Sequence, residues 1–385
     1  MLRISITTYQ NDDDLVSVPQ SEVELDGSDV SGEVAITSPF DTARIRVESK
    51  PAIMISLIKR MQNDEIDMAP DFQRAFVWGD GAQSRLIESL ILCIPIPSFY
   101  FDATNRDKWI IVDGLQRLTT IRRFVIKNEL ALCGLEFLAN YNGYKFSELP
   151  RNFKRNIEEA EITMYLIQEG TPTDVKFNLF KRINTGGLPL STQEIRHALN
   201  RGHITDFLAK LSQSVEFSRA TSNGISSKRM DDRECITRFI AFKQKGPEAY
   251  TIGDYDAFLN KAMDDANKME QNAFADLEKS FLRAMDASFD IFGKYAFRKQ
   301  YKKNAARKII NKALFEAWSI NLAKLSDLEI EHLIERKEYL TDRFIKLLSE
   351  DKEFEDAVSQ GTGAVKKVQY RFKRIKEIIK EILDA

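Results

Sequence analysis

The sequence predicts an α+β protein in which a mixed α/β domain is followed by an all-helical region. Aromatic and β-branched runs at residues 98–101 and 108–112, separated by a polar turn, are typical of two neighbouring strands. Beyond about residue 203 such runs fade, and apolar residues recur with helical spacing. We therefore divide the chain into an acidic leader (1–44), an α/β domain (45–203) and a helical domain with basic faces (204–385).

The leader is strongly acidic. Residues 1–39 carry eight acidic residues and one base, Arg3. This composition is typical of a mobile arm, or of a solvated segment that partly docks as an edge strand. The N-terminus lacks an apolar run behind a basic start, and no stretch approaches the roughly 18 apolar residues of a membrane span. We expect a cytoplasmic protein without a membrane partner.

The α/β domain begins with helical patterns and then alternates strand and helix. Apolar spacing predicts a helix over 53–61 and a second over 86–91, which the prolines at 95 and 97 end. The second strand run passes through an Asp-Gly turn into a helix that contains Leu118 and Ile121. Farther on, Ser191 and Glu194 have the spacing of a capping box and predict another helix start.

The charge balance restricts basic sites to local segments. Fifty-six basic and 58 acidic residues give a net charge of −2, which excludes a histone-like mode of action. Residues 294–312 nevertheless carry eight bases and no acid, and residues 366–380 carry seven bases and one acid. Each segment is either a solvated helix face or a DNA-backbone contact. The DNA-binding candidates are Arg298, Lys299, Lys302, Lys303, Arg371 and Arg374.

The spacing of the cysteines and histidines restricts the kinds of metal site that the chain can form. The three cysteines and three histidines form no C-x-x-C or H-x-x-x-H cluster, which excludes zinc ribbons and zincins. Any metal must therefore be held by oxygen ligands.

The sharpest local feature is Asp113-Gly114-Leu115-Gln116-Arg117. A strand, a glycine turn and a helix start place free N–H groups and the positive end of the helix dipole beside an acid, an amide and a guanidinium. Such a group suits a metal or water ligand together with a phosphate clamp. The alternative is a β-turn in which Asp113 caps the helix and Arg117 forms a surface salt bridge.

Two further polar groups accompany this turn. Gln73 and Arg74 lie among aromatic residues, where Arg74 meets either a core carboxylate or an anion in a cleft. Arg182 precedes a turn with the composition of a phosphate-contacting loop, or of an ordinary connection between helices; the turn consists of Asn184, Thr185, Gly186 and Gly187.

Four of these segments, in their order and spacing, resemble a known family. FQRAFVW, SRLIESLILCIPIPSFYF, IIVDGLQRLTTIRRF and FNLFKRINTGGLPLSTQEIRHAL look like the N-terminal domain of GmrSD-type restriction endonucleases, within the ParB/sulfiredoxin-like superfamily. The resemblance implies a ParB/sulfiredoxin-like fold over 45–203. It also implies nucleoside triphosphate hydrolysis at a D-G-Q-Q-R motif, which Asp113, Gly114, Gln116 and Arg117 match. Leu115 departs from the motif, and it either removes a nucleotide contact or faces the core.

The resemblance implies roles for the candidate residues. Asp113, Gln116 and Arg117 would be catalytic, and Asp113 would also hold Mg²⁺. The nucleotide, GTP, ATP or CTP, would be bound by Gln73, Arg74, Gly114, Arg182, Asn184, Thr185, Gly186 and Gly187. Related restriction enzymes commonly add a histidine-dependent nuclease domain, but only His332 follows residue 203. We therefore expect a separate nuclease or defence-system subunit as a partner, and homo-oligomerisation stays open.

The main functional hypothesis is an NTP-hydrolysing protein of a DNA restriction or anti-phage defence system. One alternative is a DNA-binding sensor that is gated by nucleotide without turnover. A second alternative is a Mg²⁺-dependent DNA nickase that uses Asp113 as its metal ligand.

Overall fold

The computed structural model describes residues 23–24, 45–68, 78–183 and 190–385, which form two compact units. The first unit runs from Arg46 to Glu169, and the second runs from Gly170 to the C-terminus. The sequence analysis placed residues 170–203 with the α/β domain, whereas the structure groups them with the helices that follow. Among the described residues, every helix is too short or too polar to cross a membrane.

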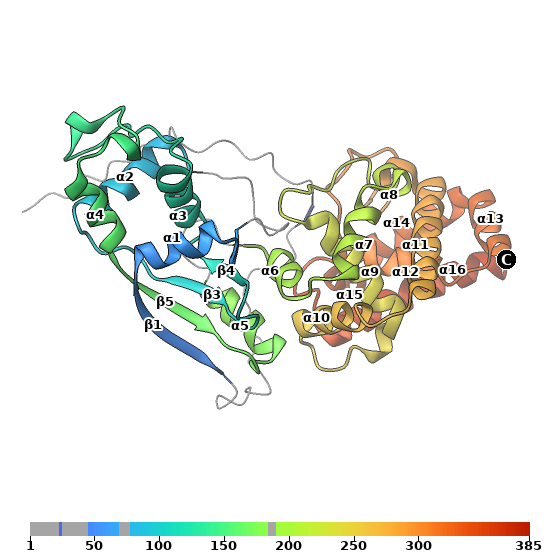
Figure 1. Cartoon of the computed structure of the whole chain (residues 1–385). Helices are drawn as coiled ribbons and strands as arrows, with labels where there is room; N and C mark the ends of the chain where they lie inside the picture. Colours follow the sequence, from blue (N-terminus) through green and yellow to red (C-terminus); the bar gives the residue numbers. More distant parts are fainter. Residues whose placement is uncertain (1–22, 25–44, 69–77, 184–189) are drawn as a thin grey trace, which may run out of the picture. The chain divides into compact units, whose positions relative to one another are not determined.

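The first unit contains a five-stranded sheet and its covering helices (Figure 1). Its elements are β1 (Val47–Ile53), α1 (Met54–Gln62), β2 (Ile66–Asp67), α2 (Asp80–Ile91), β3 (Phe99–Asp102), β4 (Trp109–Asp113), α3 (Leu115–Ile121), a π-helical turn (Arg122–Ile126), two 3₁₀ turns (Ala139–Tyr141 and Phe146–Glu148), α4 (Arg151–Glu159) and β5 (Glu161–Ile167). The strands expected at 98–101 and 108–112 and the helices expected near 53–61 and 86–91 are confirmed.

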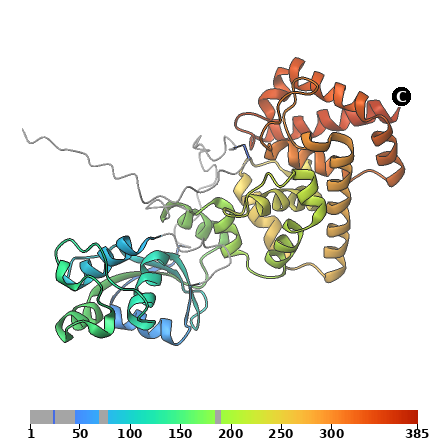
Figure 2. The same ribbon diagram turned by 90° about the horizontal axis from the view of Figure 1, so that it is seen from above.

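The sheet has the strand order β1-β5-β3-β4-β2. β1 runs antiparallel to β5 and β3 runs antiparallel to β4, while β5 and β3 are parallel. Because side chains alternate along a strand, Phe99 and Phe101 of β3 and Met164 of β5 point to one face, where they share a core with α1 to α4. Figure 2 shows the ribbon of this unit from a second direction. The helices therefore cover one face of the sheet, and β4 ends at the edge of this core.

The second unit is helical in its described part. Its helices are α5 (Thr173–Ile183), α6 (Thr192–Leu199), α7 (His203–Ser212), α8 (Val215–Thr221), α9 (Asp231–Lys245), α10 (Tyr255–Ala266), α11 (Gln271–Phe292), α12 (Lys312–Leu322), α13 (Asp327–Glu335), α14 (Lys337–Glu350), α15 (Lys352–Ala357) and α16 (Val365–Leu383). Together with the sheet of the first unit, they confirm the predicted α+β class.

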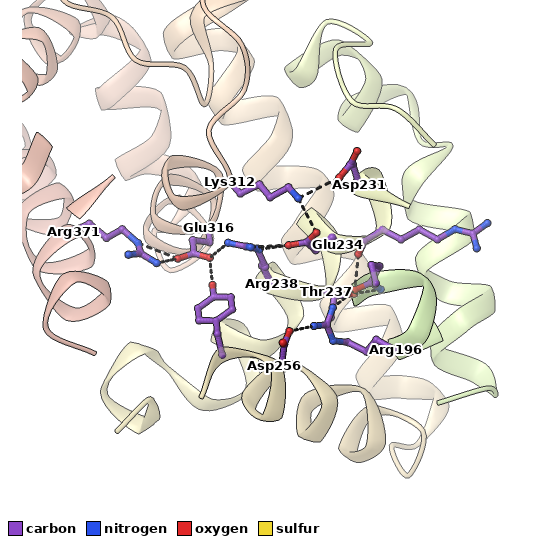
Figure 3. Close-up of polar contacts among 12 residues, drawn as sticks. Arg196, Asp231, Glu234, Thr237, Arg238, Asp256, Lys312, Glu316 and Arg371 are labelled. Carbon is purple, nitrogen blue, oxygen red and sulfur yellow. Dashed lines mark hydrogen bonds and ion pairs between the residues drawn. The ribbon is translucent and has the colours of Figure 1, made fainter. Parts of the chain in front are cut away.

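A network of buried charges joins the helices of the second unit (Figure 3). Glu316 on α12 and Arg371 on α16 are both fully buried and form an ion pair, and Arg371 also donates to Thr362 O at 2.6 Å. Arg238 on α9 donates to Glu234 Oε1 at 2.6 Å and reaches Glu316 Oε2 at 3.4 Å. These contacts tie three helices together inside the unit.

Two further ion pairs join helices of the second unit. Lys312 pairs with Glu234 at 2.7 Å. Arg196 on α6 is buried and pairs with Asp256 on α10 at 2.8 Å. This second pair explains why α6 belongs to the helical unit: its buried guanidinium is compensated there.

Only two residues of the acidic leader lie in the described part of the chain. Val23 forms an isolated parallel bridge with Ile310, and Glu24 pairs with Lys299 at 2.8 Å. This is the local strand-like docking that was one of the two alternatives for the leader.

The basic segment 294–312 is not the helix that its sequence suggested. A 3₁₀ turn ends at Tyr295, and α12 begins only at Lys312. Phe297 and Asn304 adopt left-handed backbone conformations, with φ of 62° and 57°. A left-handed residue cannot continue a right-handed helix, so the segment between them is an irregular connection.

Candidate functional site

Asp113 to Arg117 form the predicted strand, turn and helix. Asp113 is the last residue of β4, Gly114 is the N-terminal cap of α3, and Leu115 is its first residue. Gly114 has φ of 105°, and a Cβ at this position would lie 2.5 Å from Phe99 Cδ1. Only glycine fits, because the turn needs a left-handed residue and the Phe99 ring fills the space of a side chain.

Arg117 reaches back to the end of the strand. Its Nη2 donates to Asp113 Oδ2 at 2.6 Å, and the side chains of Arg117 and Asp113 are 10% and 24% exposed. Its Nη1 donates to the Pro97 and Ser98 carbonyls, and its guanidinium lies over the Phe99 ring. Arg117 is therefore neither a surface salt bridge nor an open phosphate clamp: it holds Asp113 in place.

Leu115 and Gln116, which lie between Gly114 and Arg117, have different surroundings. Leu115 is half-buried and packs against the core of the first unit, the arrangement expected of the second alternative for its departure from the family motif. Gln116 Oε1 accepts the backbone N–H of Trp78 at 3.4 Å. Gln116 thereby connects the start of α3 to the segment that precedes α2.

Burial sets the electrostatics of the carboxylate. It raises the pKa of Asp113 above its ordinary value, although the Arg117 guanidinium and the Gly114 backbone N–H oppose this change. Tyr100 on β3 lies opposite Asp113 in the sheet register, and burial, followed by Tyr165 and Asp113, raises the pKa of its hydroxyl. A partly exposed carboxylate with a raised pKa is suited to accept a proton from a bound molecule.

The donor set near Asp113 fits only one way of holding Mg²⁺. No group of three or more His, Cys, Asp or Glu side chains that could hold a metal occurs among the residues the structure describes. Mg²⁺ is commonly held by one or two carboxylates together with substrate phosphates and water. Asp113 fits this mode, and it does not fit a cage made by the protein alone.

The other nucleotide-binding candidates, apart from Gly114, belong to the second unit or lie outside the described residues. Arg182 is exposed in the last turn of α5, in the second unit. Gln73, Arg74, Asn184, Thr185, Gly186 and Gly187 lie outside the described residues. The predicted capping box at the start of α6 is present, because Glu194 N–H donates to Ser191 Oγ at 3.1 Å and Ser191 N–H donates to Glu194.

Two of the predicted DNA contacts are contradicted by burial. Arg298 is 0% exposed and donates to Thr221 O at 2.8 Å, and Arg371 is 0% exposed in its pair with Glu316. A guanidinium is taken out of water only when its charge and donors are compensated, and these partners lie within the protein. Arg298 and Arg371 therefore hold the helical unit together.

The remaining DNA-binding candidates differ in exposure. Lys299 is 11% exposed and is paired with Glu24, and Arg374 is 31% exposed and is paired with Asp351 and Glu377. Lys302 and Lys303 are exposed on the irregular connection before α12, as are Arg307 and Lys308. Four exposed bases thus lie within seven residues at 302–308, and two of them were not among the candidates. Helix α16 also exposes four bases, spread over a longer segment: Lys366, Lys373, Lys376 and Lys380.

Two tyrosines in the sheet near Asp113 were not among the sequence candidates: Tyr100 is the register partner of Asp113, and Tyr165 lies one strand farther away. Tyr100 and Tyr165 are partners on β3 and β5, and their rings stack with centroids 4.7 Å apart. Their alternation with the core residues on each side was a usable signal, because it places both on the sheet face away from the helices.

A comparison with protein families gives a match over residues 55–200, from α1 to α6. The matching family is described as the N-terminal domain of GmrSD restriction endonucleases. This segment resembles the GmrSD N-terminal domain. The resemblance expected from the four motifs is thus confirmed, and the GmrSD-like segment contains Asp113 to Arg117. A search among curated proteins found no match to the chain.

Proposed function

We propose that the first unit binds a nucleoside triphosphate (GTP, ATP or CTP) at Asp113 and hydrolyses it as part of a DNA restriction or anti-phage defence system. The observation that carries this proposal is the partly exposed Asp113 carboxylate, fixed by Arg117 at a strand-turn-helix junction inside the GmrSD-like segment. A restriction endonuclease acts on DNA, so DNA is the substrate class that the family supports.

Asp113 and Arg117 would have different roles in the hydrolysis. Asp113 orients a water molecule against the terminal phosphate and accepts its proton, which its raised pKa favours. Arg117 is a positioning residue that keeps the carboxylate aimed outward from the strand end. Mg²⁺, when bound with the nucleotide, neutralises phosphate charge, and Asp113 is the carboxylate available to it.

Phosphate release from GTP, ATP and CTP tests this assignment. We expect Asp113→Asn to lower turnover by about 100-fold or more, the usual contribution of a positioned proton acceptor. Lys108→Ala is the matched control, because Lys108 belongs to an exposed ion pair with Asp64 in the same unit. Turnover that is the same in Asp113→Asn and in the unchanged protein would exclude Asp113 as a catalytic residue.

One observation supports a second candidate, a nucleotide-gated DNA-binding sensor without turnover. Arg117 already donates to Asp113 and to two carbonyls, so it would have to exchange these bonds to stabilise a developing phosphate charge. A sensor needs no such exchange. It would show nucleotide binding without phosphate release, and a DNA affinity that changes when nucleotide is added.

We propose that the exposed bases at 302–308 contact DNA. These bases lie on an irregular connection and not on the helix face that the sequence suggested. A double charge reversal, Lys302→Glu with Lys308→Glu, should weaken duplex binding and reduce the salt dependence of the binding constant by about one counterion per lost phosphate contact. Lys337→Glu with Lys346→Glu is the control, because it makes the same change in net charge at two exposed lysines of α14 in the second unit. Equal losses in the two variants would point to total charge and not to this segment.

A further inference from the structure

Four residues on four strands are successive register partners across the sheet of the first unit. Ser49 on β1 is the register partner of Tyr165 on β5, Tyr165 is the partner of Tyr100 on β3, and Tyr100 is the partner of Asp113 on β4. Direct partners on regularly paired strands present their side chains on the same face. The β3–β4 pairing shifts register between Tyr100 and Phe101, and at this bulge the Tyr100 hydroxyl interacts with the charges of Asp113 and Arg117. The candidate carboxylate thus stands at one end of a row that also contains two aromatic rings.

The row lies on the face of the sheet that α1 to α4 leave uncovered. The neighbours of the tyrosines along their strands, Phe99, Phe101, Met164 and Leu166, are buried in the core with those helices. Strand alternation then directs Tyr100 and Tyr165 to the other side. Both tyrosines are half-buried, and Ser49 is exposed.

The two rings are stacked in a way that leaves one ring face for another partner. Their centroids are 4.7 Å apart and their planes differ by 16°, so each ring covers one face of the other. Beyond Tyr165 the next residue of the row is Ser49, whose small side chain cannot cover an aromatic face. On β1, therefore, no large side chain stands directly opposite the outer face of Tyr165, and Val47 and Pro51 border it diagonally.

We propose that this outer face of Tyr165 stacks with the base of the nucleotide whose phosphates lie at Asp113, with Ser49 as the floor of the base site. This inference rests on the proposed function and adds the base-binding end of the same site. A base over β1 lies three strand spacings from Asp113, roughly 14 Å at about 4.8 Å per spacing, a span suited to the ribose and phosphate chain of a triphosphate.

Two features connect the ends of the row. Tyr100 stands between Tyr165 and Asp113, and its hydroxyl experiences the charges of both Asp113 and Arg117. Tyr100 is thus placed under the ribose and the first phosphate, where a neutral hydroxyl can donate a hydrogen bond. Because every base has an aromatic face, the stack itself accepts purines and pyrimidines.

The test compares nucleotides with a ligand that has no base. Calorimetric titration of the full chain with ATP, GTP, CTP and inorganic tripolyphosphate should show weaker binding of nucleotides to Tyr165→Leu, by about fivefold to 100-fold. Tripolyphosphate should bind this variant as it binds the unchanged protein. Tyr165→Phe should keep nucleotide affinity, because it keeps the ring.

Tyr339→Leu is the matched control, since Tyr339 is 51% exposed on α14 of the second unit. Thermal unfolding of each variant separates lost binding from lost folding. If Tyr165→Leu binds nucleotides as tightly as the unchanged protein does, or if that protein binds tripolyphosphate as tightly as nucleotides, the stacking site is refuted while phosphate binding at Asp113 stands. If the unchanged protein binds none of these ligands, the proposed function and this inference both fail.

Discussion

Arg117 in the first unit and Arg371 in the second make similar bonds in different surroundings. Each pairs with a carboxylate and donates to backbone carbonyls. Glu316, the partner of Arg371, is 0% exposed and also meets Arg238 and Tyr255, whereas Asp113, the partner of Arg117, keeps 24% of its side chain exposed. Removing one partner of an ion pair that is enclosed on all sides destabilises a fold, while a pair with an accessible carboxylate can also meet a ligand.

The largest expected difference between the two pairs concerns stability. Glu316→Ala leaves Arg371 charged and buried without its partner, which should cost about 3–5 kcal/mol in the free energy of unfolding. Asp113→Ala should cost less, because water can reach its site. Hydrogen exchange of α16 and of β4 measures each unit separately, and Glu338→Ala, at an 82% exposed residue, is the control. A larger loss for Asp113→Ala would invert the comparison.

The turn glycine allows a second test of how tightly the first unit holds Asp113. Gly114→Ala should destabilise the unit by about 2–4 kcal/mol, since it combines a left-handed backbone with a contact against Phe99. Gly143→Ala is matched, because Gly143 has φ of 88° but a Cβ added there would meet no atom within 4 Å. It should cost only about 1–2 kcal/mol. Equal losses would mean that the Phe99 ring moves aside and does not fix the turn.

Acidification should change the stability contributions of Glu234 and Asp113 in opposite directions, and by less than the substitutions described above. Burial alone would raise the pKa of Glu234, but Lys312 and Arg238 hold it well below its ordinary value, so its stabilising contribution is present at neutral pH and is lost as the pH falls below about 4.5. The pKa of Asp113 is raised, so its contribution is fully present below about pH 3.8 and is lost as the pH rises through its folded-state pKa.

These signs can be read from paired variants. From neutral pH to about pH 4, the stability difference between the unchanged protein and Glu234→Gln should shrink, while acidification should favour the unchanged protein over Asp113→Asn. Hydrogen exchange of α9 and β4 across this range is the measurement. A stability difference for Asp113→Asn that moves in the same direction as that for Glu234→Gln would show that pairing with Arg117 outweighs burial.

Local patterns predicted the local parts of the site. The apolar runs at 98–101 and 108–112 gave β3 and β4, and the Asp-Gly step placed the start of α3 at Leu115. The Ser191–Glu194 spacing predicted the capping box at the start of α6. Each of these features depends on residues within one or two turns of chain, so a single sequence contains the information.

The features that sequence reasoning missed depend on distant partners. Arg371 resembled a solvated base because its partner, Glu316, is 55 residues away. Lys299 is compensated by Glu24, which is 275 residues away in the leader. The row from Ser49 to Asp113 requires the register of four strands, and a single sequence does not encode that register in any local pattern.

The pairing of β1 with β5 also has a consequence during synthesis. Gln168 donates to Glu48, 120 residues earlier, and the two strands between these ends pair over their whole length. Closing so long a loop is entropically costly and slow. A nascent chain must therefore present β1 unpaired until Glu161–Ile167 has left the ribosome. A chain that stops before Glu161 leaves the edge of β1 open to pairing with other chains, which makes premature termination an aggregation hazard.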